Sequence, residues 1–456
     1  MPQRPVGENE PAAAWAGSGR VWDVIVVGAG PAGSTAARTA AEAGAEVLLL
    51  DRAAFPRYKT CGGGLLGESL RLIPESARST IESRVAEAVI TDRFRRRVVV
   101  RREQPFLAMV RRAEFDQALA DAATDAGAHF IDGVTVREIT QHSPGEVAEV
   151  TDGDRLVEVR TTAGTARARV VIGADGTSGR VGRYVGVRAG GVDLGLEDEV
   201  AMPADADAWR DRVHLDWGDA SGSYAWVFPK HDSLTVGVIQ RKGSPDETRE
   251  YLTAWRRHLG LAGPESETLH SSGHLTQWRA AGSPLRRGSV IVAGDAAGLL
   301  EPWTREGISF ALRSGTWAGE AAAAAARVAS ASPSASSATA AGADAGVATA
   351  AVAGAAAGAG AGAAAPAGAT TAAAAAAAAE DRALSRYEHR VAEALEPEQT
   401  TGTELLQVFE RRRALVHTLL ASPPGARWFV RFCRGDTTLA RFARHRLVMR
   451  LVRALR

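Results

Sequence analysis

Cysteine and long apolar runs are scarce in this chain of 456 residues. The two cysteines, Cys61 and Cys433, lie far apart in the sequence, which gives no disulfide framework and fits a reducing compartment. No run of about twenty strongly apolar residues could span a bilayer, and residues 1–20 lack the apolar stretch of a signal peptide. These absences predict a cytoplasmic protein.

An excess of charge of one sign is also missing, because the formal net charge is only +1. A chain without a global positive field is not expected to bind nucleic acid. The ten histidines are scattered, and His270 and His274 are separated by Ser-Ser-Gly, which does not favour a metal-binding helix. No HExxH, P-loop or GxSxG element occurs. We therefore expect no metal site and only ordinary surface or core roles for histidine.

A dinucleotide-binding unit begins at Val24. The apolar run Val24–Val27 predicts a buried parallel strand, and the run ending at Leu50 predicts a second one. Between the two strands lies a glycine turn of the kind that brings a helix N-terminus to a pyrophosphate. Asp51 directly follows the second strand, at the position where a carboxylate can bind a ribose. The residues assigned to the cofactor here are Gly28, Gly30, Pro31, Ala32, Gly33, Asp51 and Arg52. Gly62, Gly64 and Gly67 repeat the spacing without a preceding strand, so we count one fingerprint.

The remaining pattern predicts an interrupted domain. A helix is expected over 111–127, strands over 133–171 with turns at Pro144-Gly145 and Asp152-Gly153, and a buried strand at Val290–Ala293. The predicted parts are a disordered leader (1–20), a dinucleotide-binding domain (21–190) that includes some strands of the second domain at about 85–110, a β-rich substrate domain (191–285), the return of the first domain (286–328), an Ala/Gly-rich low-complexity insertion (329–379) and a helical C-terminal region (380–456).

The insertion and the C-terminal end differ sharply in composition. The insertion lacks large apolar residues, so we expect a flexible segment with helical edges, and helical periodicity to resume at about Asp381. Nine arginines lie between Arg427 and Arg456 against the single acid Asp436. The final helix is predicted to have two different faces. One face carries the arginines Arg446, Arg450 and Arg453, and the other carries the apolar residues Leu447, Leu451, Val452 and Leu455. Two interpretations stay open, a solvated helix packed on its own domain and an interfacial helix on anionic lipid at the inner face of the membrane.

Three separated motifs resemble flavoproteins of the p-hydroxybenzoate hydroxylase type. They are the unit from Val24 to Asp51, the segment 173–176 (Gly-Ala-Asp-Gly), and Gly294-Asp295 with Glu301-Pro302. Within that superfamily, Phe-Pro-Arg-Tyr-Lys-Thr-Cys-Gly-Gly-Gly over 55–64 and Tyr-Ala-Trp-Val-Phe-Pro-Lys over 224–230 are similar to the geranylgeranyl reductase branch. The resemblance covers roughly residues 21–325 and, weakly, 381–430.

The resemblance implies an α/β fold, an FAD-binding dinucleotide fold with an inserted β-rich substrate domain and a helical C-terminal region. It adds further FAD-binding residues, namely Cys61, Gly62, Gly63, Arg112, Asp175, Gly176, Gly294, Asp295, Gly307 and Ile308. Ordinary roles stay open for three of them: helix N-capping for Asp295, a turn for Asp175, and an ion pair with Asp116 for Arg112.

The same resemblance places three residues at the reaction centre. Cys61 is expected beside the isoalloxazine ring, where it either lines the pocket or assists proton delivery. Tyr224 and Trp226 share one strand face and are expected to line a substrate cavity, unless they belong to ordinary core packing. Lys230 is expected either to pair with a diphosphate or to be an exposed turn lysine.

Two segments depart from the family's pattern. The strand after Tyr224 usually ends in Gly-x-Gly, whereas here Ile239 replaces the second glycine of the pair that starts at Gly237. Near the flavin, Trp303 and Arg305 stand where small residues are expected. We expect either a different substrate or a partly covered flavin face.

The function implied is an FAD-dependent reductase that saturates carbon–carbon double bonds of a hydrophobic isoprenoid chain, carried by a prenylated quinone, geranylgeranyl diphosphate or a prenyl lipid. The lack of a second fingerprint implies that NAD(P)H binds transiently, or that a redox partner protein such as reduced ferredoxin supplies the electrons. Three further functions stay open: an FAD-dependent monooxygenase acting on an aromatic or polyketide substrate, a flavin-dependent halogenase, and a non-enzymatic protein with FAD as a structural or redox-sensing group. The chain length, the double bonds reduced and the oligomeric state stay open as well.

Overall fold

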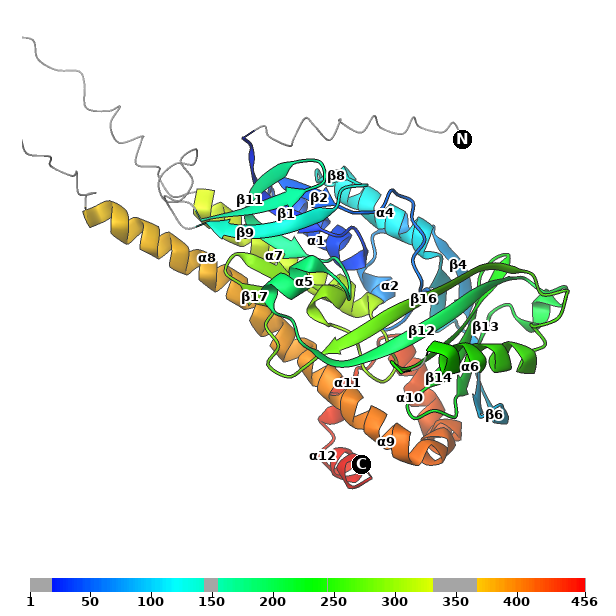
Figure 1. Ribbon diagram of the computed structural model, residues 1–456. Helices are drawn as coiled ribbons and strands as arrows, with labels where there is room; N and C mark the ends of the chain where they lie inside the picture. Colours follow the sequence, from blue (N-terminus) through cyan, green and yellow to red (C-terminus); the bar gives the residue numbers. More distant parts are fainter. Residues whose placement is uncertain (1–18, 143–154, 244, 331–366, 456) are drawn as a thin grey trace, which may run out of the picture.

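The first of three sheets is built around the predicted glycine turn (Figure 1). The computed structural model describes residues 19–142, 155–243, 245–330 and 367–455. A parallel core of five strands runs in the order β18-β11-β1-β2-β8, and β17, β10 and β9 extend it. The strands are β1 (Val21–Val27), β2 (Val47–Leu50), β8 (His129–Ile131), β9 (Val136–His142), β10 (Leu156–Thr161), β11 (Thr165–Gly173), β17 (Arg286–Arg287) and β18 (Val290–Val292).

Close packing at the turn explains its glycines. Gly28 has φ of +101°, and a Cβ there would lie 2.3 Å from the carbonyl oxygen of Ala174. A Cβ on Gly33 would lie 1.7 Å from the carbonyl oxygen of Gly28, so only glycine lets helix α1 (Pro31–Glu42) approach the strand. The apolar side chains of β1 and β2 are buried, and α1 and α7 pack against these strands.

The second sheet has seven strands in the order β16-β12-β15-β14-β13-β5-β6. It combines strands from within 85–110 with strands of the later β-rich region, because β5 pairs in parallel with β13. The strands are β5 (Glu87–Asp92), β6 (Arg95–Arg101), β12 (Ala189–Ala201), β13 (Arg212–Trp217), β14 (Tyr224–Pro229), β15 (Ser233–Arg241) and β16 (Thr268–Arg279). A helix that the alternating pattern did not predict, α6 (Pro245–His258), packs on this sheet through Leu252 and Trp255.

A third, small sheet joins the two, in the order β3-β7-β4. Its strands are β3 (Gly64–Leu65), β4 (Ile81–Val85) and β7 (Leu107–Val110). Helix α4 (Arg112–Asp125) follows β7 and buries Phe115 and Leu119, close to the predicted helix over 111–127. Three short helices complete this half of the chain: α2 (Ser69–Leu72), α3 (Glu75–Arg78) and α5 (Arg180–Val185).

Helices make up the rest of the chain. After β18, a short 3₁₀ turn (Gly294–Ala297) leads to α7 (Ile308–Ser330), which packs against α1. The C-terminal helices are α8 (Ala367–Ala394), α9 (Glu396–Ala421), α10 (Pro423–Cys433), α11 (Leu439–Ala443) and α12 (Arg446–Ala454). None of the described helices combines the length and the hydropathy that crossing a bilayer would require.

The low-complexity insertion is predicted to have helical edges, and α7 reaches Ser330 while α8 starts at Ala367. Helix thus resumes earlier than the expected Asp381, because alanine is a strong helix former. In α12, Val452 and Leu455 of the predicted apolar face do pack inward, together with Met449, in a cluster that includes Val408 of α9. The prediction is wrong for Leu447, which is 80% exposed.

Several predictions concern residues outside those the structure describes. These are the leader up to residue 18, the turns at Pro144-Gly145 and Asp152-Gly153, and the part of the low-complexity segment from 331 to 366.

Candidate active site

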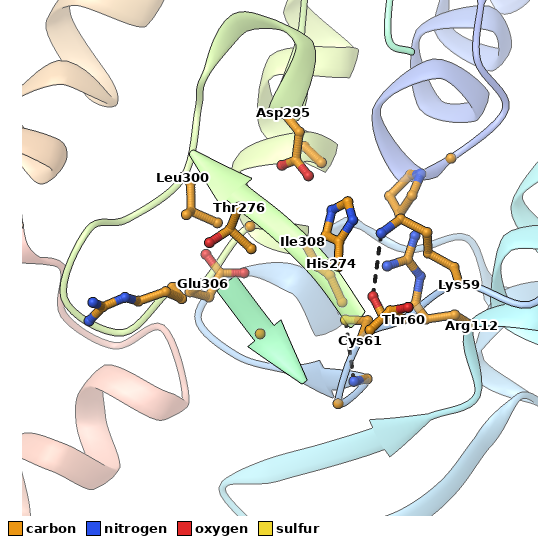
Figure 2. Close-up of a pocket in the computed structure, with 18 of the residues that line it drawn as sticks. Lys59, Thr60, Cys61, Arg112, His274, Thr276, Asp295, Leu300, Glu306 and Ile308 are labelled. Atoms are coloured by element: carbon orange, nitrogen blue, oxygen red, sulfur yellow. Dashed lines mark hydrogen bonds between the residues drawn. The ribbon is translucent and has the colours of Figure 1, made fainter. Parts of the chain in front are cut away.

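One cavity of about 550 Å³ lies between the first and second sheets and also reaches the C-terminal helices. Its walls come from the ends of β1, β2 and β11, from the 55–64 segment, from β13 and β14, and from α9 and α10. The cavity has a polar part at the glycine turn and an apolar part toward α10. Figure 2 shows some of the lining residues, among them Cys61, Asp295 and Glu306.

The polar part is organised by the carboxylate after β2. Asp51 is buried and accepts hydrogen bonds from the backbone N–H of Ala29 (2.8 Å) and of Ala53 (2.9 Å), which fixes the turn. Gly30 lines the cavity, and a Cβ there would meet only the end of the Arg57 side chain, at 3.5 Å. The helix α1 therefore presents its N-terminus to open space, the arrangement that binds a pyrophosphate.

Three polar side chains at this end leave hydrogen-bonding capacity for a bound group. Within the described residues, Arg57 Nη1 and Asp175 Oδ1 are buried without a hydrogen-bond partner. Asp295 lines the cavity, in the 3₁₀ turn that follows β18. Burial raises the pKa of Asp295, although Lys59 and Arg112 act in the opposite direction. These groups fit the hydroxyls and phosphates of FAD.

Asp175 and Arg112 both line the cavity and also make contacts within the protein. Asp175 caps helix α5, because its Oδ2 accepts the N–H of Val181 (3.0 Å). Arg112 forms the expected ion pair with Asp116, at 2.8 and 2.9 Å. Asp175 and Arg112 thus each make a structural contact within the protein and also line the cavity in which FAD binding is predicted.

The side chains of Lys59, Arg112 and His274 lie near Cys61 (Figure 2). Burial disfavours the charge of Arg112, but the neighbouring Asp116 and Cys61 raise its pKa above the ordinary value. Burial and the nearby Arg112 lower the pKa of Lys59. Burial, with the charges of Lys59 and Arg112, also lowers the pKa of His274 to about 3, so that imidazole is neutral at pH 7.

The Cys61 loop is held by two buried groups behind it. The backbone N–H of Cys61 donates to Glu197 Oε1 (2.8 Å), and Lys230 Nζ donates to the carbonyl oxygen of Gly62 (2.6 Å). Lys230 is only 3% exposed, so the expectation of an exposed turn lysine is wrong. A Cβ on Gly62 would lie 2.5 Å from the ring of Phe228, so glycine is required where the loop meets β14.

The apolar part of the cavity is walled by β7, β13, β14, α9 and α10. None of the lining residues that these five elements contribute is charged. They are Leu107, Met109, Val213, Leu215, Trp217, Tyr224, Trp226, Phe228, Phe409, Leu420, Trp428, Phe429, Phe432 and Cys433. The Tyr224 hydroxyl donates to the carbonyl oxygen of Thr304 (2.7 Å), so its polar atom is already satisfied.

Arg305 does not place a free charge in the cavity. Its Nε donates to Asp193 Oδ2 (2.8 Å), and its other nitrogens donate to the carbonyl oxygens of Trp303 (2.7 Å) and Gly222 (3.1 Å). Both ionic side chains are almost fully buried, at 4% and 1% exposure. The Arg305 guanidinium therefore binds groups of the protein itself. The large side chain closes the cavity wall between the second sheet and α7.

Glu306 lines the main cavity and a second one of about 20 Å³ behind it. Its carboxylate accepts the N–H of Ser309 (2.6 Å) in the first turn of α7. Burial raises the pKa of Glu306 to about 8, and Glu398 and Glu301 act in the same direction, whereas that hydrogen bond and Arg313 oppose the shift. Glu306 therefore holds a proton at neutral pH.

Most residues predicted from the sequence meet in this cavity. Gly33 and Gly294 do not line it. They pack behind its wall, where a Cβ would overlap Gly28 and Ala32 respectively. Lining residues not predicted from the sequence include Arg57, Lys59, His274, Glu306 and the aromatic side chains of α10. His274 also lines the cavity, on strand β16.

Comparisons with known sequences and structures agree with this geometry. Residues 21–332 match the FAD binding domain family. The geranylgeranyl diphosphate reductase of Rhodobacter capsulatus is 32% identical over 307 residues, 66% of this chain and 75% of that protein. The menaquinone reductase of Mycolicibacterium smegmatis is 30% identical over 320 residues, 65% and 75% of the two chains. A geranylgeranyl bacteriochlorophyll reductase-like structure from Thermoplasma acidophilum superposes with a TM-score of 0.67 at 19% identity, covering 91% and 96%.

The fold and the cavity define an FAD-dependent oxidoreductase. The chain belongs to the geranylgeranyl reductase family of these enzymes, which confirms the resemblance carried by the 55–64 and 224–230 segments. The mixed α/β fold with its helical C-terminal region and the FAD cofactor are confirmed as well.

Proposed function

We propose that the protein reduces carbon–carbon double bonds in the isoprenoid chain of a lipid-like substrate. The observation that carries this proposal is the continuity of the cavity. An FAD-binding end opens directly into an apolar end whose wall, from five elements, is free of charged side chains. An apolar, flexible chain gains from burial there, whereas a phenolate or another anion would lose its hydration without a compensating partner.

The charge distribution also orients the substrate. Arg52, Lys59 and Arg112 line the polar end of the cavity, where they would face FAD, whereas Arg305, the lining cation beside Tyr224, is paired with Asp193. The apolar end is therefore suited to the chain, and a quinone, diphosphate or phospholipid head group would remain outside this apolar part. This arrangement supports a prenylated quinone, geranylgeranyl diphosphate or a prenyl lipid as substrate.

FAD supplies hydride chemistry at this site when it is bound in its reduced form. Reduction breaks the π bond and forms two C–H bonds, one from a hydride equivalent and one from a proton. The aromatic faces of Trp226 and Phe228 would stabilise positive charge that develops on the alkene, and the dry wall would exclude water. The electrons come from NAD(P)H, bound transiently, or from a protein such as reduced ferredoxin.

We infer that Glu306 supplies the proton, because it is a protonated carboxyl group in the cavity wall next to the small cavity. The Glu306→Gln variant is expected to lose at least about a hundredfold in kcat with unchanged FAD content. In the unaltered enzyme kcat should fall as pH rises through about 8, because the donor is then ionised. Steady-state kinetics from pH 6 to 10 measure both effects.

A matched control for this variant is Glu68→Gln, which alters the small cavity without touching the main one. It should retain kcat and the same pH profile. An unchanged kcat in Glu306→Gln would show that another group delivers the proton.

Cys61 is expected to shape the cavity without supplying the proton. The Cys61→Ser variant should keep about half or more of the kcat, because serine preserves the loop and its N–H bond to Glu197. Turnover is measured at matched FAD content. A loss of about tenfold or more in kcat, with normal KM, would assign proton delivery to the thiol.

The experiment that tests the function is mass spectrometry of the products formed with a reductant and a panel of prenyl and aromatic compounds. A gain of paired hydrogens on a prenyl chain supports the proposal. Addition of one oxygen atom to an aromatic compound would place the enzyme with the flavin monooxygenases, and halide incorporation would place it with the halogenases.

A further inference from the structure

Exposed apolar side chains concentrate at one edge of the molecule. Figure 1 shows β6 and the helices α9, α10 and α12 along this edge, which we call the C-terminal face. Six large hydrophobic side chains are exposed among the described residues, and four of them belong to it. They are Val99 on β6 (42% exposed), Leu415 and Leu419 on α9 (38% and 56%) and Leu447 on α12 (80%).

The same face is strongly basic. From residue 405 to the end, the sequence has twelve arginines and only two carboxylates, although the whole chain has a net charge of +1. Both carboxylates are already neutralised: Glu410 pairs with Arg241 (3.0 Å) and Asp436 with Arg71 (3.0 Å). The exposed arginines include Arg411, Arg412, Arg427, Arg431, Arg446 and Arg450.

The helices that carry this charge are also the end wall of the cavity. Leu419 points outward, while the next residue, Leu420, lines the cavity. On α10, Arg427 and Arg431 are exposed, whereas Trp428 and Phe432 line the cavity. One layer of helix thus separates the apolar cavity from a surface that combines leucine with arginine.

We propose that the C-terminal face binds the surface of an anionic lipid bilayer. Arginines pair with lipid phosphates, and the exposed leucines insert among the acyl chains at the boundary. An acidic electron-donor protein would also complement the charge, but it would not need four exposed apolar side chains. The bilayer is therefore the occupant that both observations fit.

Binding at this face would hold the apolar end of the cavity against the membrane. A prenyl chain could then pass from the bilayer to the cavity across α9 and α10 without crossing water. This second step rests on the proposed function, whereas the binding itself does not.

The test is co-sedimentation of the full-length holoprotein with vesicles of phosphatidylcholine alone or containing phosphatidylglycerol. The protein is expected to bind the anionic vesicles, less at high salt, and to bind neutral vesicles weakly. The variants Leu419→Asp and Arg446→Glu/Arg450→Glu should each lower the partition coefficient by about tenfold or more. Leu269→Asp is the matched control, because Leu269 is 53% exposed on β16, at the opposite edge of the second sheet from β6. Arg137→Glu/Arg210→Glu makes the same change in net charge elsewhere.

Equal losses in the test and control variants would overturn the proposal, as would failure of the unaltered protein to bind anionic vesicles. Binding only to an acidic redox protein would assign the face to that partner instead. Reduction of detergent-dispersed prenyl substrate is measured in the same variants and should not change. If no variant reduces such a substrate, the proposed function fails while the vesicle result stands by itself.

Discussion

The Gly30→Val variant is expected to fold normally and to lose FAD. Gly30 has φ of −75° and ψ of −174°, values that valine adopts readily before a proline. A Cβ would meet only the flexible end of Arg57, at 3.5 Å, so the protein itself has room for it. The added methyl groups would instead occupy the space in front of the α1 N-terminus. We expect FAD affinity to fall by at least about a hundredfold, or about 2.7 kcal/mol.

The measurement is FAD titration of the apoprotein, together with circular dichroism and thermal melting. Gly33→Val is the contrasting variant, because its Cβ would lie 1.7 Å from the carbonyl oxygen of Gly28, and it should fail to fold. Gly243→Val is the neutral control, with its nearest atom at 3.7 Å. Retention of FAD by Gly30→Val at the unaltered affinity would contradict the assignment of the glycine turn.

The Arg305→Met variant is expected to lose about 3–5 kcal/mol of unfolding free energy. The substitution leaves the Asp193 carboxylate, which is 1% exposed, without its cation, and it also removes the donors to the Trp303 and Gly222 carbonyls. Denaturant unfolding of the apoprotein measures the loss. The double variant Arg305→Met/Asp193→Asn should recover part of it, because the buried charge is then gone.

The exposed pair of Arg241 and Glu410 is the matched control for this prediction. Arg241 is 67% exposed, so Arg241→Met should cost less than about 1 kcal/mol. A similar loss in the two single variants would mean that Arg305 is not a structural ion pair. Its role as a charge available to substrate would then be reconsidered.

The contrast between these residues shows what a sequence can and cannot reveal. The glycine turn was predictable because every one of its requirements is local: a strand, a left-handed turn and a helix follow one another within a few residues. By contrast, Lys230 is followed by the polar residues His231 and Asp232, a typical turn, yet its Nζ lies on the Gly62 carbonyl 168 positions earlier in the chain. No local pattern records that contact.

The sequence by itself determined the dinucleotide fold, because its glycine turn is a short motif whose spacing is set by backbone geometry. Its motifs also carried the resemblance that identified the enzyme family. Only the tertiary structure decided that His274 and Glu306 face the cavity, that Arg305 is paired with Asp193, and that α10 supplies the aromatic end wall. It also decided that Leu447 of α12 faces outward. Burial and charge pairing at these positions arise from segments distant in the chain, so they follow from packing and not from local periodicity.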